Sequence, residues 1–167
     1  MSNHRYILRR DWQCALHPSE RAIVNFVMLN PSTADDVFDD ATIRRCVGFA
    51  KRWGFSGIVV TNLFAYRATD PRELKSLSRI NWALAVGAEN DGHLKREAEG
   101  AHSVVFAWGD NADSLGRRRA EVVAMLQRFD PLCIRLTARG NPAHPVRERY
   151  TEAPQTFFRS TDSPERQ

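Results

Sequence analysis

The feature that most constrains the fold is the alternation of short apolar runs with longer segments of helical periodicity. The apolar runs are rich in aliphatic and aromatic residues, as in strands buried on both faces, and lie at 21–29, 58–61, 104–108 and 132–136. The helical segments lie at 40–53, 70–98 with a break near 87–92, and 115–129. Asp39 or Asp40 can cap the first of them, and Asp70-Pro71 is a typical helix start. This order predicts an α/β fold with a mostly parallel sheet.

We expect a three-layer sandwich in which helices cover both faces of a central sheet of four to five strands. Residues 5–8 can add an edge strand to that sheet. The length of 167 residues suits one hydrophobic core. We therefore expect a single domain over 1–159 and a flexible polar tail over 160–167.

Composition narrows the class of protein. Hydrophobic residues make up 43% and charged residues 26%, which excludes disordered, collagen-like and coiled-coil chains. The longest apolar run, 82–88, is far shorter than the roughly 20 residues that a membrane-spanning helix needs. Since the first residues also lack the apolar segment of a secretory signal, we expect a cytoplasmic protein with no membrane partner.

Cysteine and charge give weaker signals. The three cysteines (Cys14, Cys46 and Cys133) form no C-x-x-C pair, which predicts buried thiols rather than a metal or iron-sulfur site.

The net charge is +4, and only three of the 24 cationic residues are Lys. Arginine binds phosphate in bidentate geometry, which favours a polyanionic partner such as DNA or a nucleotide. A GC-rich genome would enrich arginine equally well.

Polar residues are concentrated in four loops that follow the expected strands. These loops are 29–40, 62–71, 108–112 and 137–145, and each combines Asn, Asp, Arg or His with Gly or Pro. Because the carboxyl ends of parallel strands meet at one edge of a sheet, we expect the four loops to converge on one crevice. Ordinary turn chemistry is the alternative explanation for each loop taken alone.

The order and content of these segments resemble the uracil-DNA glycosylase superfamily over 22–146. The resemblance rests on Asn-Pro after the first apolar strand, Asn after the second, VVFAWGDNA, and a closing His-Pro. LNPSTAD, DDATIRR and NLFAYRATDP more closely resemble a bacterial and archaeal family known mainly as a domain of unknown function. Met28 stands where the superfamily has Gly, and Val146 where Ser often follows His-Pro. His17-Pro18-Ser19 matches the closing motif in letters but precedes the first core strand.

The resemblance implies a fold like that of uracil-DNA glycosylase and a cofactor-free hydrolase of base excision repair, which releases a deaminated or modified base from DNA. It assigns orientation of the attacking water to Asn30, recognition of the base edge to Asn62, and stabilisation of the leaving base to His144. Such a reaction needs an oriented water on one side and a hydrogen-bond donor on the other. The further substrate-binding candidates are Pro31, Ser32, Phe38 and Phe64, the last two for stacking. The phosphate-binding candidates are Thr33, Arg67, Gly109, Arg139 and Asn141.

Two other functions remain open at this point. The carboxylates Asp35, Asp36, Asp39 and Asp40 could bind Mg²⁺ in a phosphodiesterase or nucleotide hydrolase, although Asp39 and Asp40 can also cap a helix. A non-catalytic nucleic-acid or nucleotide binding module on the same scaffold is the second alternative. We expect Trp53 and Trp108 to be core residues, and 117–119 to be a solvated helix face. The oligomeric state does not follow from the sequence.

Overall fold

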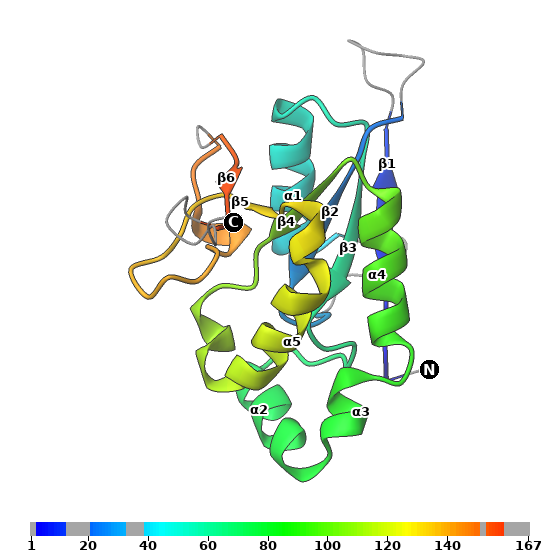
Figure 1. The fold of residues 1–167 in the computed structure, drawn as a ribbon, viewed down its shortest axis with the longest axis vertical. Coiled ribbons are helices and arrows are strands. Elements are labelled where there is room, and N and C mark those ends of the chain that lie inside the picture. The colour runs from blue at the N-terminus through cyan, green and yellow to red at the C-terminus, as the bar shows by residue number, and fades with distance from the viewer. Residues whose placement is uncertain (1–2, 13–20, 33–38, 151–152, 159–167) are drawn as a thin grey trace, which may run out of the picture.

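The computed structural model describes residues 3–12, 21–32, 39–150 and 153–158, and in these ranges it has one sheet with helices on both faces (Figure 1). The strands are β1 (Leu8–Asp11), β2 (Ile23–Met28), β3 (Gly57–Asn62), β4 (Ser103–Phe106), β5 (Leu132–Cys133) and β6 (Gln155–Thr156). Their order in the sheet is β1-β3-β2-β4-β5-β6. The four inner strands are parallel to one another, and the edge strands β1 and β6 pair antiparallel with β3 and β5.

The predicted α/β sandwich with a mostly parallel sheet is confirmed, but the sheet has six strands rather than four to five. The edge strand expected at 5–8 begins at Leu8 and runs to Asp11, where it pairs with β3. Strand β6 was not expected, because its sequence, Gln155–Thr156, is exposed and carries no apolar pattern. Only its pairing with β5 defines it as a strand.

Two apolar clusters join the layers. On one face of the sheet, α1 (Ala41–Arg52) packs Ile43, Cys46 and Phe49 against strand residues such as Phe26 and Val60. On the other face, α4 (Asn90–Gly100) and α5 (Gly116–Leu126) cover residues of β2 and β4. The shorter helices α2 (Pro71–Ile80) and α3 (Trp82–Val86) form a hairpin beyond the end of the sheet (Figure 1).

Helix boundaries follow the expected chemistry. Asp40 caps α1 by accepting from the Ile43 N–H at 2.9 Å, and Asp70 caps α2 by accepting from the Arg72 N–H at 2.8 Å. The predicted break near 87–92 occurs at Gly87, where φ is +85°. The helix predicted at 115–129 is α-helical over Gly116–Leu126, and its two ends belong to the 3₁₀ turns η1 (Asp110–Leu115) and η2 (Gln127–Phe129). A third 3₁₀ turn, η3 (Pro145–Arg147), follows later. No helix among the described residues is long and apolar enough to cross a membrane.

The chain leaves the sheet in opposite directions from β2 and β4. After β2 it crosses through α1 to β3, whereas after β4 it crosses through α5 on the other face to β5. A parallel sheet opens a crevice where neighbouring strands diverge in this way, outside their carboxyl ends. The topology therefore places a binding crevice beside the ends of β2 and β4.

Arg118 corrects one expectation from the sequence, because it is not part of a solvated face. Its side chain is only 2% exposed, whereas that of Arg117 is 72% exposed. The Arg118 Nε donates to the Leu63 carbonyl at 2.7 Å, and a terminal nitrogen donates to Asp91 at 2.6 Å. The guanidinium thereby connects α5 to the chain just beyond β3.

Replacing Arg118 with Met should lower the free energy of unfolding by about 2 kcal/mol or more, because it removes charge-assisted bonds from a buried carbonyl and a carboxylate. Arg117→Met, at the exposed neighbouring position, should change it by about 0.5 kcal/mol or less. Urea unfolding followed by circular dichroism measures both. Equal effects of the two substitutions would contradict a structural role for Arg118.

Candidate functional site

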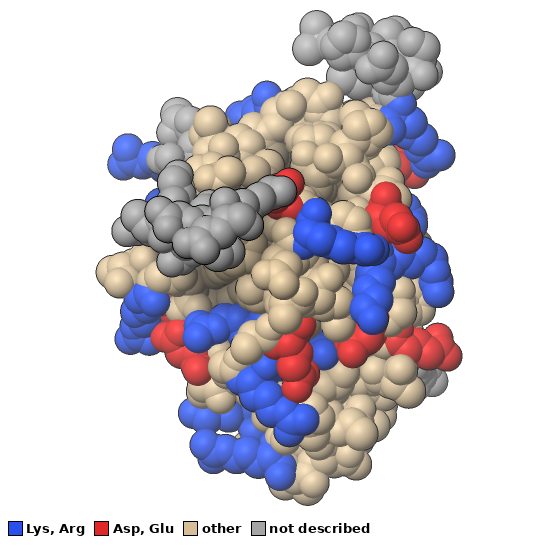
Figure 2. Space-filling model, viewed as in Figure 1, with Lys and Arg blue, Asp and Glu red and all other residues tan. Residues whose placement is uncertain are grey.

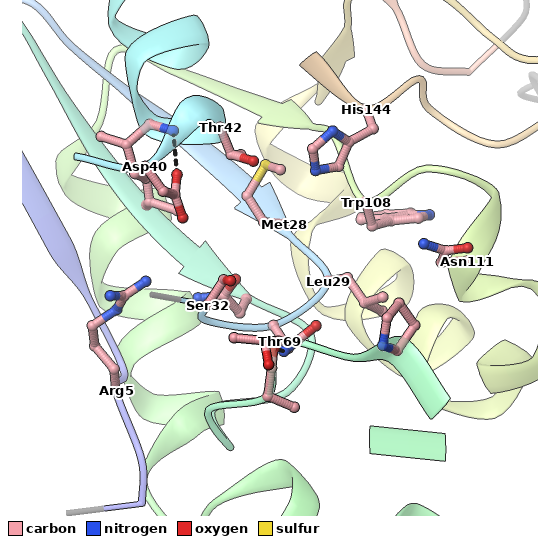
Figure 3. Close-up of a pocket in the computed structure, with 16 residues that line it drawn as sticks. Arg5, Met28, Leu29, Ser32, Asp40, Thr42, Thr69, Trp108, Asn111 and His144 are labelled. Carbon is pink, nitrogen blue, oxygen red and sulfur yellow. Dashed lines mark hydrogen bonds between the residues drawn. The ribbon is translucent and has the colours of Figure 1, made fainter. Parts of the chain in front are cut away.

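A cavity of about 180 Å³ opens at the carboxyl edge of the sheet (Figure 3). Residues from all four polar loops line it, so their expected convergence is confirmed. The lining includes Asn30 and Ser32 after β2, Asn62 at the end of β3, Trp108 after β4 and His144 after β5. An enclosed apolar cavity of about 150 Å³ can hold one six-membered ring. The size of this cavity therefore suits a small ring compound.

Asn30 links two of the loops through its side-chain amide. Its Nδ2 donates to the carbonyl oxygens of Pro31 at 2.9 Å and Ala68 at 2.7 Å. Because both partners are acceptors, the nitrogen must face them, and the orientation of the amide is fixed. Among the described residues, no group donates to Oδ1. Asn30 thus stabilises the turn through its Nδ2, and its Oδ1 remains as one oriented hydrogen-bond acceptor for a ligand or a water.

Asn62 is the last residue of β3 and is 3% exposed. Its main-chain oxygen accepts from Asn90 Nδ2 at 3.0 Å, which fixes the backbone. Its side-chain amide lines the cavity and has no hydrogen-bond partner among the described residues. Neither amide atom belongs to the fully buried side-chain atoms without a hydrogen-bond partner in the described part of the chain, so the small exposed part of Asn62 is open to the cavity, where water or a ligand can pair with it. This amide is therefore suited to pair with a ligand.

His144 extends its ring into the cavity beside Met28 and Trp108 (Figure 3). Its Nδ1 accepts from the Val146 N–H at 3.3 Å, so in the neutral ring the proton is on Nε2. Burial lowers the pKa of His144, and the nearby positive charge of Arg147 lowers it further, against an opposing effect of Asp40. The imidazole is therefore neutral at pH 7 and offers Nε2–H as a donor.

The segment that carries His144 is held by arginines. Arg45, from α1, donates to the main-chain oxygens of Pro145, at 3.3 Å, and Glu148. Arg135 forms a bidentate pair with the buried Glu148 carboxylate at 2.7 and 2.9 Å. These contacts join the segment to α1 and to the end of β5, and so limit the positions that the imidazole can adopt.

Gly109 has a different role from the phosphate contact expected of it. Its N–H donates to the Pro142 main-chain oxygen at 2.9 Å, so this N–H is not available to donate to a phosphate. Its φ is +72°, and a Cβ at this position would lie 3.0 Å from the His144 Cβ. Gly109 therefore allows the loop after β4 to pack against His144.

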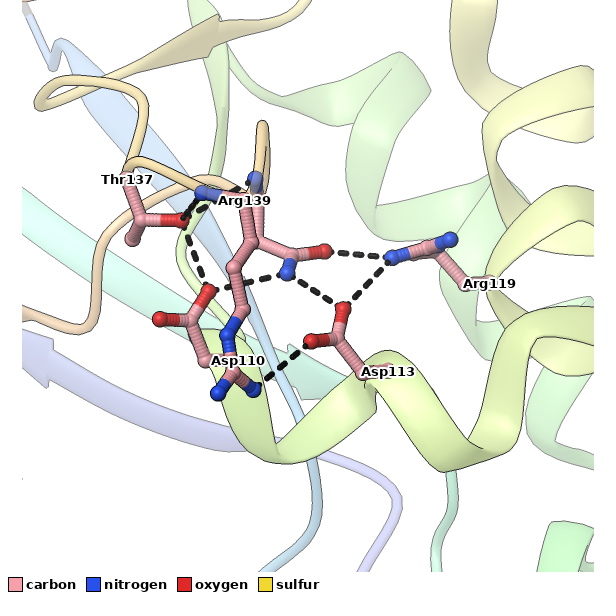
Figure 4. Close-up of polar contacts among 6 residues, drawn as sticks. Asp110, Asp113, Arg119, Thr137 and Arg139 are labelled. Atoms are coloured by element: carbon pink, nitrogen blue, oxygen red, sulfur yellow. Dashed lines mark hydrogen bonds and ion pairs between the residues drawn. The ribbon is translucent and has the colours of Figure 1, made fainter.

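Asn141 and Arg139, both phosphate candidates, belong to a polar network between η1 and the loop after β5 (Figure 4). Asn141 is 1% exposed, and its Nδ2 donates to Asp110 at 2.9 Å and Asp113 at 2.6 Å. Hydrogen bonds from Thr137 and Asn141 lower the pKa of Asp110, and that from Asn141 lowers the pKa of Asp113. A ligand could reach the Asn141 amide only if this network opened. Arg139 is 68% exposed and pairs with Asp113 at 3.1 Å.

Other candidates lie away from the cavity or outside the described residues. Phe64 is completely buried and packs edge-to-face on Trp82, with ring centroids 5.5 Å apart, so its expected stacking on a base is wrong. Arg67 is exposed, and neither Arg67 nor Pro31 lines the cavity. The Pro31 carbonyl accepts from the Asn30 amide and from the Ala68 N–H. Thr33, Phe38, Asp35, Asp36, Cys14 and the 17–19 motif lie outside the described residues.

The carboxylates proposed for Mg²⁺ have other partners where they are described. Asp39 accepts from Arg10 at 2.8 Å, and Asp40 caps α1. Among the described residues, no group of three or more His, Cys, Asp or Glu side chains is placed to hold a metal. The expectation of buried thiols is confirmed for Cys46 and Cys133: burial raises the pKa of both, that of Cys133 to about 11.

Arg5 is a cavity residue that the sequence did not reveal. It lies before β1, is 9% exposed, and directs its guanidinium toward Ser32 and Asp40 (Figure 3). The Arg5 N–H donates to the Ala65 oxygen at 2.9 Å, which holds this segment beside the loop after β3. A single arginine ahead of the first strand has no distinguishing sequence context, so only the fold identifies it.

The lowered pKa of His144 predicts a pH-dependent stability. The unfolded chain, with an ordinary histidine pKa of 6.5, binds the proton before the folded protein does. The contribution of His144 is therefore fully present above about pH 6.5 and is lost as pH falls through its folded pKa. His144→Asn should reduce the loss of unfolding free energy between pH 7.5 and 5.5, as measured by urea unfolding. His102→Asn, at an exposed histidine before β4, is the control, and equal changes in both variants would contradict the assignment.

Comparison with known proteins gives one family. Residues 5–146 match the family described as "Protein of unknown function (DUF1643)". No curated protein and no solved structure shows a significant match.

Proposed function

The chain belongs to the DUF1643 family, whose description assigns no activity, and from its cavity we propose that it binds one nucleobase and hydrolyses the N-glycosidic bond that joins the base to its sugar. One observation carries this proposal: three polar groups of different character surround a cavity of single-ring size. They are the oriented acceptor of Asn30, the unpartnered amide of Asn62 and the neutral donor of His144.

The Asn62 amide suits the edge of a base. A carboxamide offers one acceptor and one N–H₂ donor side by side, which complements a neighbouring C=O and N–H on a heterocycle. Enzymes that act on single bases read the Watson–Crick edge with such groups in a closely fitting pocket. Asn90 holds the Asn62 backbone, so the point from which the amide extends into the cavity is set before the ligand arrives.

The reaction requires charge stabilisation on two sides. The Asn30 Oδ1 would accept a hydrogen bond from water and orient its oxygen toward the anomeric carbon of the sugar. The C–N bond breaks, its electron pair leaves with the base, and the water oxygen bonds to the carbon. His144 Nε2–H would donate to the base oxygen on which negative charge develops. The proton released from the water passes through solvent to the base, so the products are the free base and the hydroxylated sugar.

The resemblance to the uracil-DNA glycosylase superfamily supports the same function. That resemblance places its functional residues after the first, second and last core strands, where Asn30, Asn62 and His144 lie in this sheet. We therefore also propose that the chain has the fold of that superfamily, and that the base it releases is deaminated or otherwise modified. Val146, which stands where the superfamily often has Ser, is 40% exposed next to the cavity residue His144.

The test is release of base in the presence of EDTA. Nucleosides and oligonucleotides that carry uracil, hypoxanthine or xanthine are incubated with the protein, and free base and abasic sites are measured. We expect base release, and we expect His144→Asn to slow it by at least about tenfold, because a preorganised donor is lost. Asn30→Ala should abolish it. Release by wild type that survives both substitutions would remove these residues from the mechanism, and absence of release from every substrate would contradict the proposal.

Asn62→Leu separates function from stability. Leucine has the same branched shape and number of side-chain heavy atoms as asparagine and removes an amide that has no hydrogen-bond partner among the described residues, so the melting temperature should be unchanged or higher, while base binding should be lost. Asn90→Leu is the matched control, because it removes two hydrogen bonds, to the oxygens of Asn62 and Leu63, and should lower stability by about 1–3 kcal/mol. A clear loss of stability in Asn62→Leu would show that its amide is structural.

A further inference from the structure

Helix α2 carries a basic face that the cavity does not explain. Arg72, Lys75 and Arg79 are spaced so that they fall within about 60° of arc on the helix, at roughly 100° per residue. Leu74 and Ser78 are buried on the side facing the protein. The three cations therefore share the outer face of α2. Lys and Arg side chains gather over this part of the molecule in Figure 2.

Carboxylates neutralise this face only at its start. Arg72 pairs with the cap residue Asp70 at 2.9 Å, and its side chain remains 90% exposed. Lys75 and Arg79 form no ion pair with any carboxylate in the described part of the chain. Exposed helix faces are commonly stabilised by opposite charges four residues apart, and this one has none. The face is thus electrostatically suited to an anionic partner.

The basic face is continuous with the cavity. A groove of about 270 Å³ is lined by Arg72, Lys75, Ser114 and Arg139, and it shares Pro71 and Asn111 with the cavity wall. Asp110 and Asp113 also line the groove. Arg119 and Arg139 pair with Asp113 and offset its negative charge. Asp110 is hydrogen-bonded by the neutral side chains of Thr137 and Asn141 and keeps its charge, so among the residues that the structure describes the groove carries one carboxylate without an ion pair beside the cations of α2.

We propose that the outer face of α2 binds the phosphates of a polynucleotide strand, so that the substrate is a nucleic acid rather than a free nucleotide. This inference rests on the proposed function, because it takes the base to lie in the cavity. The 10 residues of α2 extend about 15 Å at 1.5 Å per residue. Phosphates of one strand follow each other every 3.4 Å or so along a duplex axis, so this helix spans more than one of them. A free mononucleotide would leave most of the face unused.

Binding can be measured without chemistry. A fluorescent 20-nucleotide DNA of unmodified sequence, single-stranded or duplex, is titrated with the full chain between 50 and 200 mM KCl, and log Kd is plotted against log salt. The variant K75Q/R79Q removes the two cations that lack carboxylate partners. The control K95Q/R96Q removes the same charge from exposed positions on α4. Glutamine keeps the helix propensity of both helices.

We expect K75Q/R79Q to weaken binding and to reduce the steepness of the salt dependence by about one unit for each cation that contacts a phosphate. The control should leave both unchanged. Equal weakening in the two variants, or wild-type protein that binds neither DNA, would overturn the inference. Base release from nucleosides in the preceding assay is independent of this face, so a wild-type protein that hydrolyses nucleosides but binds no DNA would contradict this inference alone. DNA binding without any base release would sink the proposed function and leave α2 as a binding surface.

Discussion

The geometry of the site depends on the side chains that donate hydrogen bonds to the backbone carbonyls beyond the ends of the strands. Where parallel strands end, their loops lose the ladder partners that strands provide, and buried carbonyls need other donors. Among the described residues, the side chains that donate to such carbonyls include Asn30, Arg45, Asn90 and Arg118. They join loops that are far apart in the chain and keep the edge of the sheet open. The cavity lies between these loops, and the Asn62 side chain lines it without a hydrogen-bond partner among the described residues.

Much of this arrangement follows from local sequence. The apolar runs and cap residues indicated the inner strands and the starts of α1 and α2, because burial on both faces and end-capping are local requirements. The rule for parallel sheets then brought the strand-end residues together, which placed Asn30, Asn62 and His144 around one cavity without knowledge of the tertiary structure. The chemistry expected of each residue remains a prediction.

Other features depend on contacts between distant parts of the chain and could not be predicted from the local sequence. Phe64 follows β3 by two residues, and only the packing of Trp82 shows that it faces the core. Arg118 lies between two exposed or half-exposed arginines and differs from them only because α5 directs it toward the Leu63 carbonyl. The sequence predicts Gly109 to be a phosphate-binding glycine, but its positive φ and its close approach to His144 depend on the loop after β5, which packs against it.

The most direct test of this account is a crystal structure of the protein soaked with free uracil, a base with a single ring. The account predicts a planar ring in the cavity, with its edge hydrogen-bonded to the Asn62 amide and a carbonyl oxygen of the base facing the Nε2 of His144. A cavity that stays free of the base at saturating concentration, with the Asn62 amide hydrogen-bonded to the protein itself, would contradict it.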